Sequence, residues 1–174
     1  MKPRFIWALL LCVLATSGCG TTKTVTRTVT VDAAAKSGLA PPAELTQFGH
    51  IHSLQLKGDH YVMRFDPELF LMGVTANTAA AEDGAVSPGE PVPNDNYRVD
   101  EGHRLFTFLV PSNAHVTVVT GGGGPIGSTA IDVAELARIV NGGKHLKLFE
   151  PLDTGVWIRY RIDTVRSIAQ QYQP

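Results

Sequence analysis

The chain has 174 residues, with 15 Lys and Arg against 16 Asp and Glu, and its formal net charge is −1. This balance gives no electrostatic reason to expect binding to nucleic acid or to an anionic membrane surface. The two cysteines, Cys12 and Cys19, both lie near the N-terminus. We therefore expect neither a disulfide framework nor a cysteine nucleophile in the rest of the chain.

Residues 1–18 have the layout of a secretory signal peptide. Two basic residues precede a short apolar run, Phe5 to Ala15, which is too short for an ordinary transmembrane helix. Cys19 is placed as in a bacterial lipobox, although Thr16 stands where an aliphatic residue is usual. We predict an extracytoplasmic lipoprotein, attached by acyl chains (palmitate) on Cys19 to the outer face of the cell membrane. Without lipidation of Cys19 the protein would be secreted.

Residues 19–44 join this predicted membrane anchor to the rest of the chain. They are rich in Thr, contain Thr-Val-Thr twice and have no large apolar side chain before Leu39. Alternation of Thr and Val is compatible with an edge strand. Because the segment follows the anchor directly and ends near Pro41-Pro42, we expect a disordered tether instead.

Residues 45–174 are expected to form a single β-rich domain. Phe48–Lys57 and Tyr61–Phe65 alternate apolar and polar residues on either side of Gly58-Asp59, which predicts a β-hairpin. A two-residue loop would set the cross-strand pairs Lys57 with His60, Leu56 with Tyr61, Leu54 with Met63 and His52 with Phe65.

A helix is predicted directly after this hairpin. Asp66 is a favoured N-cap residue, and Pro67 suits the first helical position. Apolar and small residues then recur at helical spacing as far as Ala80, before Glu82-Asp83-Gly84. The pattern predicts a helix that ends near Glu82, with Gly84 at the left-handed C′ position.

The remaining residues predict short strands and one more helix. Ala85–Asn96 contains three prolines and is expected to be an exposed loop. Asp132 with Glu135 three residues later resembles a capping box, so a second helix should run from Asp132 to Val140. Gly121 to Gly124, together with Pro125 and Gly127, predict a flexible loop. Strands are expected at Tyr97–Asp100, Arg104–Pro111, His115–Thr120, Gly155–Asp163 and Thr164–Ile168.

Together these elements predict an α+β domain of mainly antiparallel strands. The expected form is a small curved sheet or a partly open barrel, OB-like in its most specific version, with two short inserted helices.

Three stretches together resemble a family of uncharacterised secreted or lipid-anchored proteins of Gram-positive bacteria. They are Arg64–Gly84, Glu90–Gly102 and Arg161–Pro174. The family pattern is a strand ending in Asp-Pro, an Ala-rich helix, a Val-Pro-Asn-Asp-Tyr loop and a Gln-Tyr-x-Pro end. This chain carries an additional residue, Asn96, in the loop. The resemblance implies a place in the cell envelope but no activity.

The first candidate recognition feature is the loop that carries Asn94, Asp95 and Tyr97. The second is the strand face that bears Trp157, Arg159 and Arg161, which could bind an anionic ligand. The alternatives are a set of ordinary turn formers and a face of long side chains covering the sheet.

A metal site is only weakly indicated. His50 and His52 are two apart on a predicted strand, and a catalytic zinc site normally needs a third protein ligand. We expect no cofactor, and the sequence leaves open whether the protein is an enzyme. The predicted function is a lipid-anchored binding or structural module that meets an envelope protein or a cell-wall ligand. The alternative is a metal-dependent hydrolase outside the membrane.

Overall fold

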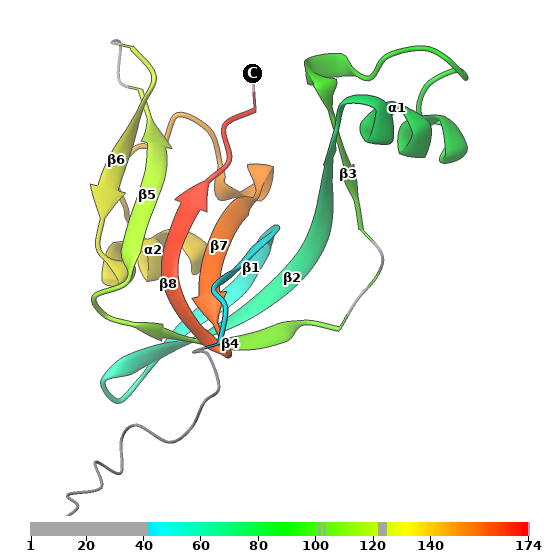
Figure 1. Cartoon of the computed structure of the whole chain (residues 1–174). Coiled ribbons are helices and arrows are strands. Elements are labelled where there is room, and N and C mark those ends of the chain that lie inside the picture. The colour runs from blue at the N-terminus through cyan, green and yellow to red at the C-terminus, as the bar shows by residue number, and fades with distance from the viewer. Residues whose placement is uncertain (1–41, 101, 103, 122–124, 174) are drawn as a thin grey trace, which may run out of the picture. The chain divides into compact units, whose positions relative to one another are not determined.

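The computed structural model describes residues 42–173 except 101, 103 and 122–124. The predicted signal peptide, Cys19 and almost all of the predicted tether lie outside the described residues. The described residues form one compact unit (Figure 1). Its elements are β1 Leu45–Lys57, β2 His60–Met72, α1 Gly73–Glu82, η2 Pro93–Asp95, β3 Asn96–Val99, β4 Phe106–Pro111, β5 His115–Thr120, β6 Gly127–Ile131, α2 Val133–Val140, η3 Leu152–Thr154, β7 Val156–Arg161 and β8 Thr164–Gln170.

Five of the strands pair around a ring. β1 is antiparallel to both β2 and β7, β2 is antiparallel to β4, and β7 is antiparallel to β8. A parallel bridge between Leu109 of β4 and Thr164 of β8 completes the circuit. The domain is therefore α+β and mainly antiparallel, with a partly barrel-like, OB-like sheet, as the sequence predicts.

The barrel interior holds the main hydrophobic core. Alternate residues of each strand point inward, so the strand period of two fills the ring with apolar side chains. Val133 and Leu136 of α2 are buried in the same core. The buried strand residues are Leu54, Tyr61, Met63, Phe65, Phe108, Val110, Val116, Val156, Ile158, Val165 and Ile168.

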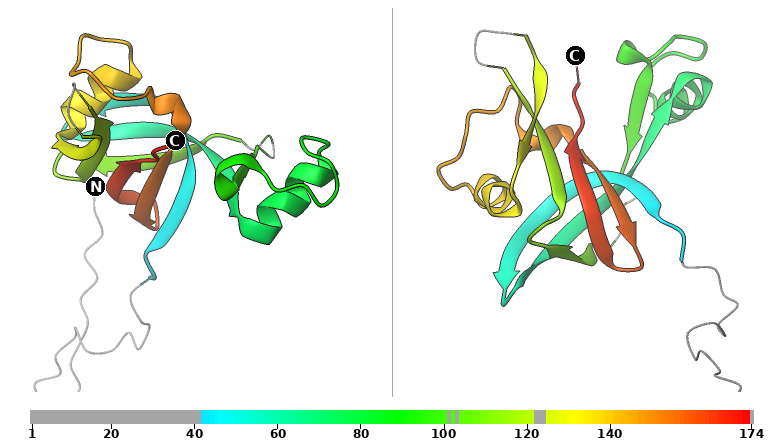
Figure 2. Two further views of the ribbon diagram at one scale, coloured as in Figure 1. Left: turned by 90° about the horizontal axis from the view of Figure 1, so that it is seen from above. Right: turned by 60° about the vertical axis from the view of Figure 1, so that its left-hand side comes forward.

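Two extensions leave the ring. β5 runs parallel to β8 and forms a hairpin with β6. On the other side β2 continues beyond the barrel, where Leu69–Met72 pair with β3. We call Leu69–Val99, which includes α1, the arm; it projects away from the barrel (Figures 1 and 2). Its own core consists of Ala76, Ala80 and Val92.

The prediction that Asp66 caps a helix is wrong. β2 runs through Asp66 and Pro67, and α1 begins only at Gly73, after the N-cap Met72, whose side chain makes no capping hydrogen bond. β1 continues alongside, with Gly49 opposite Pro67. Tertiary pairing thus overrides a favourable local capping signal.

Pro67 is tolerated in this strand because of where it lies. β4 pairs with β2 only as far as Phe65, and β3 pairs with β2 only from Leu69. In the interval between them β2 has a pairing partner on one side only, β1. A proline, which has no N–H, is found in sheets at such places.

The predicted end of the first helix is confirmed, since α1 ends at Glu82 and Gly84 has a φ of +73°.

The first hairpin follows the predicted register for three pairs, Lys57–His60, Leu56–Tyr61 and Leu54–Met63. The fourth predicted pair, His52 with Phe65, is wrong. A β-bulge between Ile51 and Ser53 makes Ile51 the partner of Phe65 and leaves His52 exposed. The bulge is favoured because it turns an isoleucine instead of a histidine toward the core.

The glycine-rich loop is shorter than predicted, because Gly127–Ile131 forms β6. This strand was missed because its residues are exposed and show no apolar alternation. The parallel pairing of β8 with β4 and β5 was missed as well, since hairpin logic applies only to strands that are neighbours in the sequence.

Candidate binding pocket

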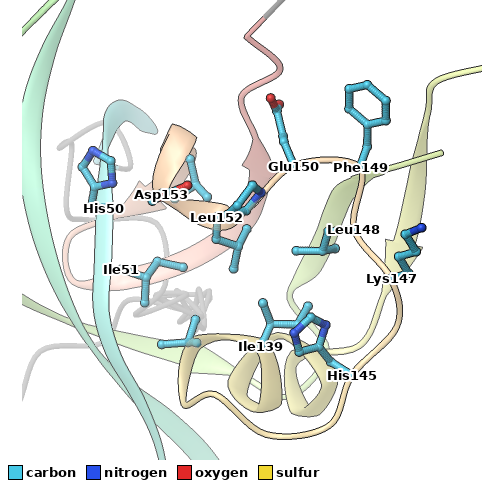
Figure 3. A pocket seen from close by; sticks show the side chains of 13 residues that line it. His50, Ile51, Ile139, His145, Lys147, Leu148, Phe149, Glu150, Leu152 and Asp153 are labelled. Atoms are coloured by element: carbon cyan, nitrogen blue, oxygen red, sulfur yellow. The ribbon is translucent and has the colours of Figure 1, made fainter. Parts of the chain in front are cut away.

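A cavity of about 680 Å³ lies between α2, the chain segment that follows it, and β1 (Figure 3). We call it the α2 pocket. Its aliphatic lining residues are Ile51, Ile139, Val140, Leu148, Leu152 and Val156. The other lining residues are His50, His145, Lys147, Phe149, Glu150, Pro151 and Asp153. The pocket therefore combines an apolar floor with a polar and charged rim, the usual composition of a ligand site.

The pocket exists because residues 144–155 form almost no regular structure yet are fixed to the fold. The Leu146 N–H donates to Oε1 of Glu135 at 2.8 Å, and the Phe149 N–H donates to the Val119 carbonyl at 2.9 Å. Nε2 of Gln170 donates to the carbonyls of Glu150 and Pro151 at 3.0 and 3.1 Å. The segment is thus held by α2, β5 and β8, and it arches over the cavity between these points.

The α2 helix is placed by its own sequence. Oδ1 of Asp132 accepts from the Glu135 N–H at 2.6 Å, which is the predicted N-cap. At the other end, Nδ2 of Asn141 donates to the Leu54 carbonyl of β1 at 2.9 Å. α2 is therefore fixed at both ends, and Ile139 and Val140 face the cavity from a rigid element.

Glu135 has a different role from the one that the capping-box pattern predicts. Its carboxylate accepts from the Leu146 N–H and from the Arg138 guanidinium. These hydrogen bonds, the Leu146 N–H first, lower the pKa of Glu135 below its usual value, and Glu135 raises the pKa of Arg138 in return. The ionised carboxylate therefore connects the first turn of α2 to the segment that covers the pocket.

The floor of the pocket can bury an apolar group, and its rim can orient a polar one. Burial of aliphatic surface supplies the favourable free energy. Lys147 has no hydrogen bond or ion pair with any other described residue. Figure 3 shows its side chain directed away from the pocket floor, so Lys147 belongs to the outer edge of the rim.

The structure separates the two histidines of the weak metal prediction. Nε2 of His50 lies 2.9 Å from Oε1 of Glu68, and its ring packs edge-on against Phe48. His52 is exposed on the bulge. Within the described part of the chain, no group of three or more His, Cys, Asp or Glu side chains is placed to hold a metal ion. His50 instead contributes to the rim of the α2 pocket.

The predicted recognition loop lies on the arm. Asn94 and Asp95 both have positive φ, +57° and +55°, within a tight turn that leads into β3. The Tyr97 hydroxyl donates to Oδ2 of Asp83 at 3.1 Å, and partial desolvation together with this carboxylate raises the Tyr97 pKa. The ring of Tyr97 packs on the arm core. Tyr97 therefore has a structural role that holds α1 to β3, and recognition by Asn94 and Asp95 stays a prediction.

The predicted anionic-ligand face is partly occupied by contacts within the chain. Trp157 packs against Phe48 and Phe70, and its indole N–H donates to Gln171 at 2.7 Å. Nε of Arg159 lies 2.8 Å from Oε1 of Glu44. Of the three predicted residues, only Arg161 makes no such side-chain contact with the described residues.

Sequence reasoning did not find the α2 pocket. Its lining comes from β1, α2, the arching segment and β7, and none of these carries a recognisable site motif. The available signal was the length of irregular chain between α2 and β7, because long loops inside compact domains are often functional.

Comparison with family models, with curated proteins and with solved structures gave no match to this chain. The class of protein is thus defined by the fold and the site: an OB-like barrel with a projecting arm and an apolar pocket beside α2. Neither described helix has the length and apolarity needed to cross a membrane.

Proposed function

We propose that this protein is a lipid-anchored, extracytoplasmic binding module of the bacterial envelope, and that the α2 pocket holds an apolar part of its ligand. The lipobox-like placement of Cys19 after a signal-like segment supports the anchor. One observation carries the binding role. A cavity of about 680 Å³ has an aliphatic floor, and hydrogen bonds hold the segment that arches over it in place.

The chemistry of the lining indicates the kind of ligand. The aliphatic floor suits an acyl chain, an aromatic ring or an apolar peptide side chain. The rim offers the imidazoles of His50 and His145 together with the carboxylates of Glu150 and Asp153. A ligand with an apolar body and a polar end fits this arrangement, whether it is a small envelope molecule or part of a polypeptide.

Blocking the cavity tests the binding role. The protein from residue 19 onward with Cys19→Ser should bind the apolar dye 1-anilinonaphthalene-8-sulfonate at one saturable site. Leu148 lines the pocket but is not among the residues that pack on the main core. Leu148→Trp should therefore fill the cavity and weaken dye binding at least about tenfold, the cost of losing a buried apolar group.

The matched control is Leu56→Trp, because Leu56 is an exposed leucine that does not line the pocket. Equal dye affinity in the two tryptophan variants would contradict the pocket assignment. In cells, Cys19→Ala should make the protein removable from membranes by a high-salt wash, and retention through that wash would contradict the lipid anchor. Crosslinking of the anchored protein followed by mass spectrometry should then recover the ligand or partner, and Leu148→Trp should reduce that product.

A further inference from the structure

Exposed apolar side chains gather at one end of the barrel, which we call the β7–β8 end. It comprises the turn between β7 and β8, the start of β1 and the neighbouring part of β4. Leu45 lies opposite Tyr160 in the β1–β7 pair, and the Leu109 N–H donates to the Asp163 carbonyl at 2.8 Å. The exposed apolar residues of this end are Leu45, Phe106, Leu109 and Ile162.

Ile162 is held in a conformation that costs energy. It has a φ of +59°, in the left-handed region that β-branched residues avoid, and 72% of its surface is exposed. An asparagine or glycine would form this turn with less strain, and a polar residue would suit the exposure better. Neither stability nor solubility explains an isoleucine here, so its exposed side chain points to a contact outside the domain.

Arginines lie beside two of these apolar side chains, Phe106 and Ile162. Arg64 and Arg104 line the same shallow hollow as Phe106 and Ile162, and Arg161 immediately precedes Ile162. Arg64 donates to the Thr107 hydroxyl. Among the described residues, no carboxylate lies within ion-pair distance of any of these three arginines.

Glu44 and Asp163 are the acidic residues that adjoin Leu45 and Ile162 in the sequence. Glu44 is paired with Arg159, and the Asp163 carboxylate accepts from the Thr164 hydroxyl at 3.1 Å. Among the described residues, the positive charges of Arg64, Arg104 and Arg161 are therefore not offset by any ion pair. These three guanidinium groups make this end cationic in character, although the whole chain is nearly neutral.

The compensating negative charge lies on the arm and its flanks. Between Asp66 and Asp100 the sequence has seven acidic residues and a single basic one, Arg98. Figures 1 and 2 show α1 and the β7–β8 turn at opposite ends of the unit. The domain is thus an electric dipole, with a cationic end that bears apolar side chains and an acidic arm.

We propose that the β7–β8 end docks on the surface of an anionic lipid bilayer, with the acidic arm directed away from it. Exposed apolar side chains with arginines beside them are the features of a peripheral membrane contact. The described chain also begins at this end, at Pro42. This inference rests on the proposed anchor, because residues 20–41 reach at most about 75 Å, which confines the domain near the bilayer.

Binding of the protein without its lipid anchor to vesicles tests this inference. The protein from residue 19 onward with Cys19→Ser is sedimented with phosphatidylcholine vesicles, with and without phosphatidylglycerol. Binding should require the anionic lipid and should weaken with salt. Ile162→Asn should lower the partition coefficient about tenfold, as expected for an apolar side chain withdrawn from the interface. Arg104→Gln should lower it about fivefold, and Arg104→Lys should restore it.

The matched control is Val74→Asn on the arm, because Val74 is 82% exposed and belongs to the acidic end. It should leave the partition coefficient unchanged. Asparagine accepts a positive φ, so Ile162→Asn should fold normally, and thermal unfolding of each variant checks this. Equal binding of Ile162→Asn and Val74→Asn, or binding without anionic lipid, would overturn the inference. Failure here with normal dye binding and normal Cys19-dependent anchoring would leave the proposed function standing.

Discussion

The barrel and the arm are continuous through β2, yet they are stabilised very differently. Among the described residues, the barrel core contains thirteen buried hydrophobic ones, which include large aromatic and aliphatic side chains. The arm core contains three, and two of them are alanines. Because hydrophobic stabilisation follows the apolar area removed from water, the barrel can fold by its own core, while the arm depends on a strand that the barrel holds in place.

The largest expected effect comes from emptying the barrel core. Phe65→Ala removes a fully buried ring that packs edge-on against Phe108, and it should lower the free energy of unfolding by about 4 kcal/mol. Val92→Ala in the arm core should cost about 1 kcal/mol, because less volume is lost. Urea unfolding measures the first loss, and hydrogen exchange of the α1 amides measures the second. Similar losses in the two variants would mean that the arm is as important to global stability as the barrel.

Gly49 of β1 lies opposite Pro67, where β2 leaves the barrel toward the arm. A substitution here should lower the free energy of unfolding nearly as much as Phe65→Ala. A Cβ atom at this position would lie 2.0 Å from the Asp66 carbonyl oxygen and 2.9 Å from Cζ of Phe65. Gly49→Ala should therefore push β1 and β2 apart and cost about 3 kcal/mol, the upper range for overpacking. Gly127→Ala is the control for glycine replacement, since nothing lies within 4 Å of its added Cβ and its φ is not in the left-handed region. A neutral Gly49→Ala would show that the strands can separate freely here.

The two helices allow a direct comparison of capping. Asp132→Ala should cost about 1 kcal/mol because it removes the acceptor of the Glu135 N–H. The N-cap of α1 is Met72, which supplies no acceptor, so Met72→Ser should add about 0.5 kcal/mol. If the arm opens independently of the barrel, hydrogen exchange should show the Met72→Ser gain in α1 alone, with the urea midpoint unchanged. A shifted urea midpoint would show that the two parts unfold together.

The smallest expected effect is a pH dependence carried by Glu135. Its pKa is lowered in the folded protein, so its contribution is present above the unfolded pKa of about 4.3 and is lost as the pH falls through the folded value. The difference in urea midpoint between wild type and Glu135→Gln should be greatest near neutral pH and should vanish in acid. Hydrogen exchange of Leu146 should follow the same course. A constant difference would contradict the role of the ionised carboxylate.

Local patterns in the sequence predicted the elements whose partners are close in the chain. The β1–β2 turn, the Asp132 cap, β5 and the end of α1 all follow from residues within a few positions of one another. The failures occurred where distant strands compete with such patterns. Asp66-Pro67 would cap a helix in an isolated peptide, but here β1 lies alongside and offers strand pairing through the same residues.

The candidate sites show the same division. The sequence shows Arg64, Arg104 and Arg161 far apart in the chain, and a nearly neutral net charge does not indicate that they lie at the same end of the domain. The α2 pocket was not predictable, because hydrogen bonds to α2, β5 and β8 hold its covering segment in place.

By itself, the sequence determined the α+β class, the antiparallel hairpins and the capped second helix, since these depend on alternation, turns and caps that act over a few residues. The tertiary structure alone decided the closure of the ring, the length of β2, the bulge at His52 and the separation of charge between the barrel end and the arm. Each of these depends on contacts between residues far apart in the chain, whose energies no local pattern records.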